Sequence, residues 1–260
     1  MEPVLIDELQ LTTGIDIPVE GLGVTLRQPK ICDIAILGEQ KYFMALSIFG
    51  LTTKTLRIQT PDATNWMVFQ QTLNQKIEGV KNMRTFMTNF LQLFFNEKVN
   101  LGPRSIMIQT PGEIKNIEPE DFDYFQYLVG LIGGSKLLTP VEEKFKPKNK
   151  KAAEIAEKMK KARKRLAKVK AAQNGTADQE NKGFLARYIR VAAIASPNSM
   201  SEINNLTLLQ LNDIVQTYLA KEAYDLEIKS RLAGAKGDKE LVHWMMRDPN
   251  GQDNDSIGRI

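Results

Sequence analysis

The side chains that most often carry out chemistry are scarce in this sequence. It contains one histidine, His243, and one cysteine, Cys32. Because zinc sites need three or four His, Cys or carboxylate ligands, we expect no His/Cys zinc site. His243 could act as a general base only if folding brought a carboxylate and a hydroxyl group beside it. We therefore predict no catalytic residue, no bound metal and no cofactor, and we expect His243 at the surface or at a helix end.

Two further patterns are similar to catalytic motifs. Residues 130–136 read GLIGGSK, but a phosphate-binding loop requires a glycine at position 135 and Ser or Thr at position 137, where Ser135 and Leu137 stand. We interpret these glycines as a helix stop. A group of acids lies just before, at Glu118, Glu120, Asp121 and Asp123. Acids at a helix start complement its dipole, and a pair of catalytic carboxylates is the alternative.

The charge of the chain is concentrated in one segment. Residues 144–170 contain thirteen Lys or Arg residues and two acids, Glu154 and Glu157, which gives a local charge of +11. The whole chain carries +4, so the remaining residues together carry −7. A nucleic-acid or anionic partner, the usual inference from a basic isoelectric point, would therefore concern this segment alone.

The basic segment predicts a helix, because residues 151–172 contain neither Gly nor Pro and are rich in Ala and Lys. Its apolar residues follow steps of 4, 3, 4 and 3, which is the spacing of a short coiled-coil seam: Ile155, Met159, Ala162, Leu166 and Val169. Three interpretations stay open: a solvated helix packed on one neighbour, a phosphate-binding helix, or a helix docked on an acidic protein surface of this chain or of another copy. Residues 151–172 lack aromatic residues for base stacking. The candidates for electrostatic docking are Lys158, Lys160, Lys161, Arg163, Lys164, Arg165 and Lys168.

The N-terminal part, residues 1–140, predicts an α+β domain. Apolar and polar positions alternate over residues 9–18 and 22–28, which indicates a hairpin or two small strands. We expect helices from residue 31, with Gly38 as a weak point, from residue 60, over residues 80–95 and from residue 118 to Gly133. A β-type run covers residues 104–110. The fold class that follows is mostly helical α+β with small β-hairpin elements.

Several apolar side chains are candidates for partner binding. Helix 80–95 carries a face rich in Met and Phe, which is typical either of an adaptable binding groove or, as the simpler interpretation, of a helix core. The candidates for partner binding are Met83, Phe86, Met87, Phe90, Trp244 and Met245.

The C-terminal part, residues 183–248, predicts an all-helical domain. Helical patterns cover residues 184–195 and 207–232, the second ending at Ala233 and Gly234, and a short piece follows over residues 239–247. Residues 141–182 would form the basic helix and a flexible linker, and residues 249–260 a disordered tail. We find no signal peptide and no apolar run long enough for a membrane helix. One cysteine cannot form an internal disulfide, so a cytoplasmic protein without a membrane partner is expected.

Several stretches resemble a group of bacteriophage tail and baseplate assembly proteins of long-tailed phages, similar to tail assembly chaperones. In the C-terminal part the resemblance lies in GFLARYI (183–189), NLTLLQLND (205–213), YDLEIKSRLAGAK (224–236) and HWMMRD (243–248). In the N-terminal part it lies in LRQPKICDI (26–34) and LGE (37–39), and the Lys-rich helix 150–170 is also similar. The resemblance covers most of the chain.

The resemblance implies a viral protein that acts without enzymatic activity. Proteins of this kind hold apolar surfaces of tail components before polymerisation, or stay in the virion as minor baseplate components. The expected partners are phage tail and baseplate structural proteins, with self-association as a further expectation and nucleic acid as a secondary one. The expected location is the host cytoplasm during virion assembly, and the virion is the alternative.

Overall fold

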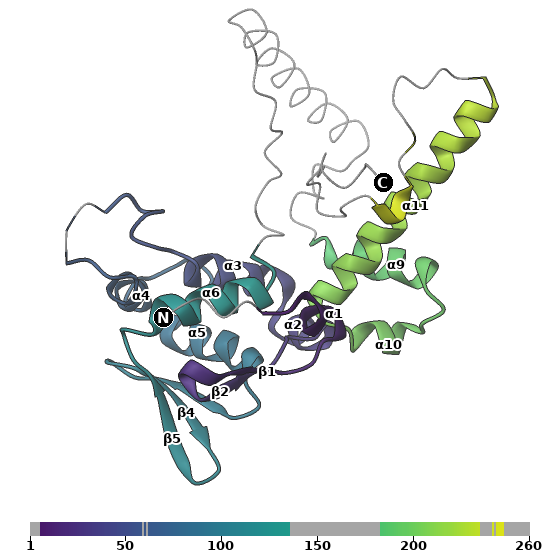
Figure 1. Ribbon diagram of the computed structural model, residues 1–260. Helices are drawn as coiled ribbons and strands as arrows, with labels where there is room; N and C mark the ends of the chain where they lie inside the picture. Colours follow the sequence, from purple (N-terminus) through teal and green to yellow (C-terminus); the bar gives the residue numbers. More distant parts are fainter. Residues whose placement is uncertain are drawn as a thin grey trace, which may run out of the picture.

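The computed structural model describes residues 6–58, 60, 62–135, 183–234, 241 and 243–246. Figure 1 shows a body that holds both sheets and most of the helices, from which α11 extends outward. The first half of the described chain runs through α1 (Glu8–Thr13), β1 (Ile17–Val19), η1 (Glu20–Leu22), β2 (Val24–Leu26), α2 (Ile31–Leu37), α3 (Glu39–Phe49), α4 (Asn65–Leu73) and α5 (Met83–Leu91). The rest runs through η2 (Gln92–Phe94), β3 (Lys98–Leu101), β4 (Ile106–Thr110), β5 (Glu113–Ile117), α6 (Phe122–Ile132), α9 (Leu185–Ala195), α10 (Met200–Asn204), α11 (Leu208–Leu232) and η4 (Trp244–Met246).

The predicted fold class is confirmed: the described chain is mostly helical with two small antiparallel sheets. Strands β1 and β2 form the predicted hairpin, with Ile17 opposite Leu26 and Val19 opposite Val24. These four side chains are buried while the intervening Pro18 and Thr25 are exposed. The alternation therefore buries one face of the hairpin, as a two-residue side-chain period requires.

The second sheet has the strand order β3-β4-β5. The run predicted over residues 104–110 is β4, but its neighbours β3 and β5 were not predicted. Strand β5 is mostly polar and exposed, so it lacks the apolar signal of a strand. It forms because the turn at Gly112, which has a φ of 102°, brings Glu113 opposite Thr110. Pairing with the more buried strand β4 stabilises β5, although the sequence of β5 itself has no strong strand pattern.

Residues 8–13 correct the sequence analysis, because they form α1 and not part of a strand. The side chain of Asp7 caps this helix by accepting from the N–H of Leu9 at 3.0 Å. Gly14 ends it in the left-handed region with a φ of 71°, a conformation that glycine adopts without steric cost. The capping residues at the two ends of α1 therefore favour a helix over the strand that the alternating pattern predicted.

Three predicted helix boundaries also differ from the structure. Helix α4 begins at Asn65 and not near residue 60, because the side chain of Thr64 accepts from the N–H of Met67 at 3.3 Å and caps it. Helix α5 covers Met83–Leu91, the central part of the predicted 80–95 segment, with Asn82 as its N-cap. Helix α6 begins at Phe122 rather than residue 118. The break predicted at Gly38 is confirmed, with a φ of 95° between α2 and α3.

Phe49 lies at the centre of the aromatic part of the core. Its ring meets those of Phe69, Phe122 and Phe125 edge-on, with centroid distances of 5.3, 5.6 and 5.7 Å. Edge-to-face pairs of this kind add stability beyond the area that they bury. Helices α3, α4 and α6 are therefore held together by aromatic side chains.

The described C-terminal helices pack against the N-terminal helices. The N–H of Ile31 donates to the carbonyl oxygen of Leu206 at 2.9 Å, and the N–H of Leu185 donates to the Glu39 carboxylate at 3.1 Å. The rings of Phe43 and Phe184 lie 5.2 Å apart. Buried residues of α9, α10 and α11 belong to the same apolar cluster as those of α2 and α3.

The predicted basic helix and linker, 141–182, and the predicted tail, 249–260, lie outside the described residues. The division of the chain into domains near residues 140 and 183 stays a prediction. Across the described ranges, no helix combines the length and the apolar character that crossing a membrane requires.

Candidate protein-binding surface

Four of the six residues predicted to bind a partner lie in the core. Met83, Phe86, Met87 and Phe90 are all buried on α5. The ring of Phe90 packs on Phe94 and Tyr42 at centroid distances of 5.3 and 5.6 Å. The Met and Phe face of α5 is therefore a helix core, the simpler of the two interpretations, and the structure leaves no room for a partner there.

The candidates for electrostatic docking fall on the basic segment, which lies outside the described residues. The set is Lys158, Lys160, Lys161, Arg163, Lys164, Arg165 and Lys168. Their role stays a prediction.

The other two predicted residues, Trp244 and Met245, lie on η4 beside α11. Met245 is 70% exposed and Trp244 is partly buried. The His243 ring lies 5.1 Å from that of Tyr224 on α11, and its Nδ1 accepts from the N–H of Met245 at 3.3 Å. His243 is exposed, as predicted. It helps to place Met245 on the side of α11.

Capping and charge stabilise both ends of helix α11. Thr207 and Gln210 form a capping box: the N–H of Thr207 donates to Gln210 Oε1 at 2.9 Å and the N–H of Gln210 donates to Thr207 Oγ1 at 3.2 Å. Such a box satisfies backbone donors that the helix leaves unpaired. Lys229 and Arg231 lie in the last turn, where positive charge is favourable. The helix predicted over 207–232 is confirmed.

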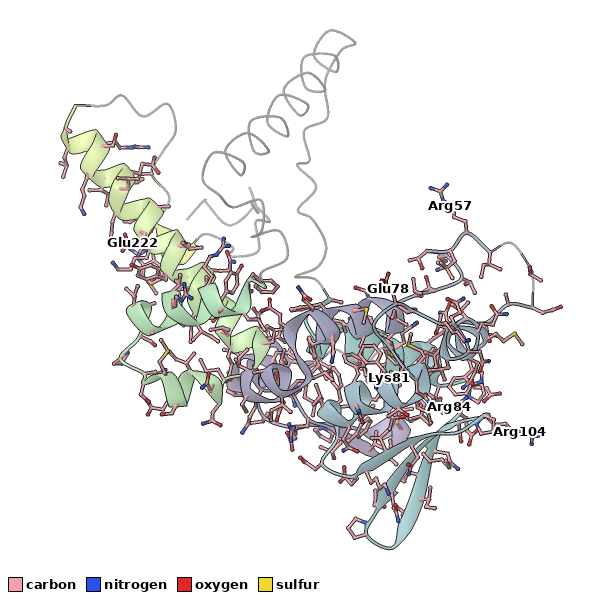
Figure 2. The ribbon with its side chains drawn as sticks, turned by 180° about the vertical axis from the view of Figure 1, so that it is seen from behind. Arg57, Glu78, Lys81, Arg84, Arg104 and Glu222 are labelled. Atoms are coloured by element: carbon pink, nitrogen blue, oxygen red, sulfur yellow. The ribbon has the colours of Figure 1, made fainter. Side chains whose placement is uncertain are left out.

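Only the first half of α11 is anchored in the body. Leu208, Leu211 and Val215 are buried, whereas no residue after Val215 in this helix is. We call residues 219–232 the arm. Figure 1 shows the arm extending away from α9 and α10, and Figure 2 shows Glu222 on it, at the other end of the molecule from Arg104.

The arm exposes large apolar side chains on two sides. Leu219 is 49% exposed and Leu226 is 69% exposed, and at 100° per residue they lie on one side of the helix. Leu232 is 82% exposed and lies with Ile228 and Tyr224 on the opposite side. The second side, together with Trp244 and Met245, forms what we call the η4 patch.

Charged side chains flank both sides of the arm. Lys221 Nζ lies 2.8 Å from the Asp225 carboxylate, and Arg231 lies 2.6 Å from Glu227. The hydrogen bond from Lys221 lowers the pKa of Asp225, and the same bond raises the pKa of Lys221. Pairs with this i,i+4 spacing support an exposed helix. They keep the arm helical where packing does not.

The described residues offer little else that could do chemistry. Within them, no group of three or more His, Cys, Asp or Glu side chains could hold a metal ion. The glycines of residues 130–136 end α6, with Gly133 as its C-cap and Gly134 at a φ of 79°. The hydroxyl of Tyr42 donates to the carbonyl oxygen of Gly133 at 3.0 Å, and burial raises the pKa of this tyrosine. Its role is to hold α3 against the end of α6.

Comparisons with protein-family models, with curated proteins and with solved structures gave no match for this chain.

The sequence analysis did not foresee the exposed residues of the arm, because it predicted one helix over residues 207–232 and did not separate Leu219 and Leu226 from the buried Leu208 and Leu211. One signal was available. Over residues 219–233 the Lys, Glu, Asp and Arg residues leave only narrow apolar rows between them. A helix that packs along its whole length keeps a wider apolar face.

Proposed function

We propose that this protein is a non-enzymatic assembly factor of a phage tail or baseplate, and that it binds a tail structural protein through the η4 patch. The observation that carries the proposal is the exposure of Leu232 (82%) on an arm that extends beyond the body, and of Met245 (70%) on η4 beside that arm. The phage assignment is supported by the sequence resemblance.

The chemistry of the patch suits a protein partner. Aromatic and Met side chains supply much of the binding energy at protein interfaces, and the flexible thioether of Met adapts to different apolar surfaces. Exposed apolar side chains that gather on one projection are typical of an interaction site. The expected occupant is an apolar helix face of an unpolymerised tail or baseplate subunit, which would be shielded from aggregation in the host cytoplasm.

The test is capture of identified phage proteins by the full-length chain from infected cells. Wild type is expected to retain tail or baseplate proteins, identified by mass spectrometry. Met245→Asp combined with Leu232→Asp should lower their recovery about tenfold or more, since a buried charge in an interface costs several kcal/mol. Ile194→Asp is the matched control, because Ile194 is 74% exposed on α9, away from the patch.

Two results would contradict the proposal. If the wild-type chain captures no tail or baseplate protein, the assembly role is contradicted. If the wild type and the double variant capture equal amounts, the η4 patch is not the binding site. Mass spectrometry of purified virions separates an assembly factor that leaves from the alternative, a minor structural component that stays.

A nucleic-acid-binding role is the second candidate, and the +11 charge of residues 144–170 is the observation that favours it. Binding through phosphates would weaken steeply with salt. It would be lost when Lys160, Lys161, Arg163, Lys164 and Arg165 are all changed to Gln. No binding of RNA or DNA at low salt would end this candidate.

A further inference from the structure

We propose that the arm is also a self-association site, at which two copies of this chain pair through α11 in antiparallel orientation. The site is the arm stripe, which we define as the row Leu219, Ala223, Leu226 and Ser230 of the arm together with Ala233, the C-cap of α11. It faces away from the η4 patch, so the inference goes beyond the proposed function and does not depend on a phage partner.

The stripe has the spacing of a coiled-coil seam. Its members are separated by 4, 3, 4 and 3 residues, which keeps them on one side of a helix. All five are exposed, and the row is about 21 Å long at 1.5 Å per residue. The row continues the side of α11 on which Leu208, Leu211 and Val215 are buried. The same helix side therefore packs in the body at one end and is left uncovered by the described residues at the other.

Leucines and small residues alternate along the stripe, which favours pairing with an inverted copy. In the antiparallel register that places Leu226 opposite Ala223 of the second copy, Leu219 falls opposite Ser230 of the second copy. Each large side chain then meets a small one, and the two-fold axis repeats both contacts. A two-fold axis requires such a self-complementary surface. A parallel pair would instead place each leucine against the same leucine of the second copy. Ala223 and Ser230 would then each face their own equivalent and leave a gap.

Charges beside the stripe select the same orientation. Glu222 and Lys229 lie two turns apart on one edge of it, and both are exposed. Neither has a side-chain hydrogen bond or ion pair among the described residues. In the antiparallel register Glu222 faces Lys229 of the second copy, and the axis gives the pair twice. In a parallel pair, Glu222 would instead face Glu227 of the second copy, and two like charges would approach each other, which is unfavourable.

The other charged residues near the stripe do not oppose this pairing. Glu227 is on the opposite edge and is already paired with Arg231 at 2.6 Å. The position that faces it from the second copy is Ala220. The Lys221 to Asp225 pair lies farther from the stripe. The short seam buries less area than a standard stable interface, so the expected dimer is weak and depends on concentration.

The orientation is tested by disulfide cross-linking of the full-length chain. In a background in which the native Cys32 is changed to Ser, two single variants are prepared, Ala223→Cys and Leu226→Cys, with tags of different mass. An equimolar mixture should form the mixed disulfide several-fold faster than either variant alone forms its own. Faster self-linking of each variant alone would show parallel pairing and overturn the proposed register.

Charge reversal tests the pairing itself by sedimentation of the purified protein over a range of concentrations. Glu222→Lys and Lys229→Glu alone should each weaken the association about tenfold, since two attractive pairs become repulsive. The double variant should return to within about threefold of wild type, because the pairs are restored with opposite sense. Leu232→Asp, on the opposite side of the arm, is the control and should dimerise like wild type.

Failure of this inference is distinguishable from failure of the proposed function. A wild-type chain that stays monomeric at all concentrations, with no mixed disulfide, overturns self-association. That result leaves capture of tail proteins by the η4 patch unaffected. Conversely, loss of tail-protein capture with an intact dimer contradicts the proposed function alone.

Discussion

The backbone N–H of Ile31 and the carbonyl oxygen of Leu206 form a hydrogen bond of 2.9 Å between the starts of α2 and α11. Lys30 and Thr207, the N-caps of these two helices, form an isolated antiparallel bridge beside it. The N-terminal end of α11 is therefore held by backbone contacts to the N-terminal part of the chain. A helix that is anchored at this end keeps a defined direction although its far end is exposed.

Gln210→Ala is expected to weaken the contacts that hold the N-terminal end of α11. The substitution removes the acceptor for the N–H of Thr207 and also the bond from Gln210 Nε2 to the carbonyl oxygen of Thr12, both of 2.9 Å. We expect a loss of about 1–2 kcal/mol in the free energy of unfolding, measured by urea denaturation. Gln216→Ala is the matched control, because the hydrogen bonds of Gln216 are long, at 3.5 Å. Equal losses in the two variants would contradict the proposed role of Gln210.

Phe90→Ala is expected to destabilise the body strongly. Phe90 is fully buried among Tyr42, Phe49 and Phe94. Removing such a ring leaves a cavity and typically costs about 3–5 kcal/mol. Met67→Ala, at a position that is 51% exposed on α4, should change the stability by about 0.5 kcal/mol or less. Thermal unfolding of both variants checks this, and a mild effect of Phe90→Ala would mean that the α5 face is not a core.

Tyr42→Phe isolates one polar contact inside the core. The change keeps the ring but removes the donor to the carbonyl oxygen of Gly133 at 3.0 Å. A buried acceptor without a partner costs about 1–3 kcal/mol. Chemical denaturation at neutral pH measures the loss, which should appear without a change in the m-value, since the exposed area on unfolding is the same.

The pH dependence of stability should reveal the same hydroxyl. Burial raises the folded-state pKa of Tyr42, while in the unfolded chain it has the ordinary value of about 10. Above that pH the unfolded chain releases a proton that the folded protein keeps, so stability falls as pH rises, by up to about 1.4 kcal/mol per pH unit. Tyr42→Phe lacks this term, and the stability gap between wild type and variant should narrow above pH of about 10. Parallel stability curves in that range would contradict the burial of an uncharged tyrosine.

Local signals in the sequence were sufficient for several elements. Thr207 starts α11 and Gly234, at a φ of 94°, follows its end, both where the sequence predicted them. Gly38 separates α2 from α3 as expected. These signals work because a cap or a positive φ is decided by a few neighbouring residues.

Other elements depended on contacts between distant residues. Strand β5 is recognisable only through its pairing with β4, and the first turn of α4 moved to Thr64 although Thr60 precedes a proline. Thr60 and Thr64 can both act as N-caps, and the structure uses Thr64, whose side chain accepts from the N–H of Met67.

The sequence by itself determined that this chain is mostly helical, that its α5 face and its α11 rows are apolar, and where its charge is concentrated. Only the tertiary structure decided which apolar row is covered. Phe90 and Leu226 both lie on apolar helix rows with the same kind of spacing, yet Phe90 is fully buried and Leu226 is 69% exposed. The physical reason is that helical periodicity reports which side chains share a side, whereas burial depends on whether another element reaches that side. Helix α11 extends beyond the elements that cover its first half.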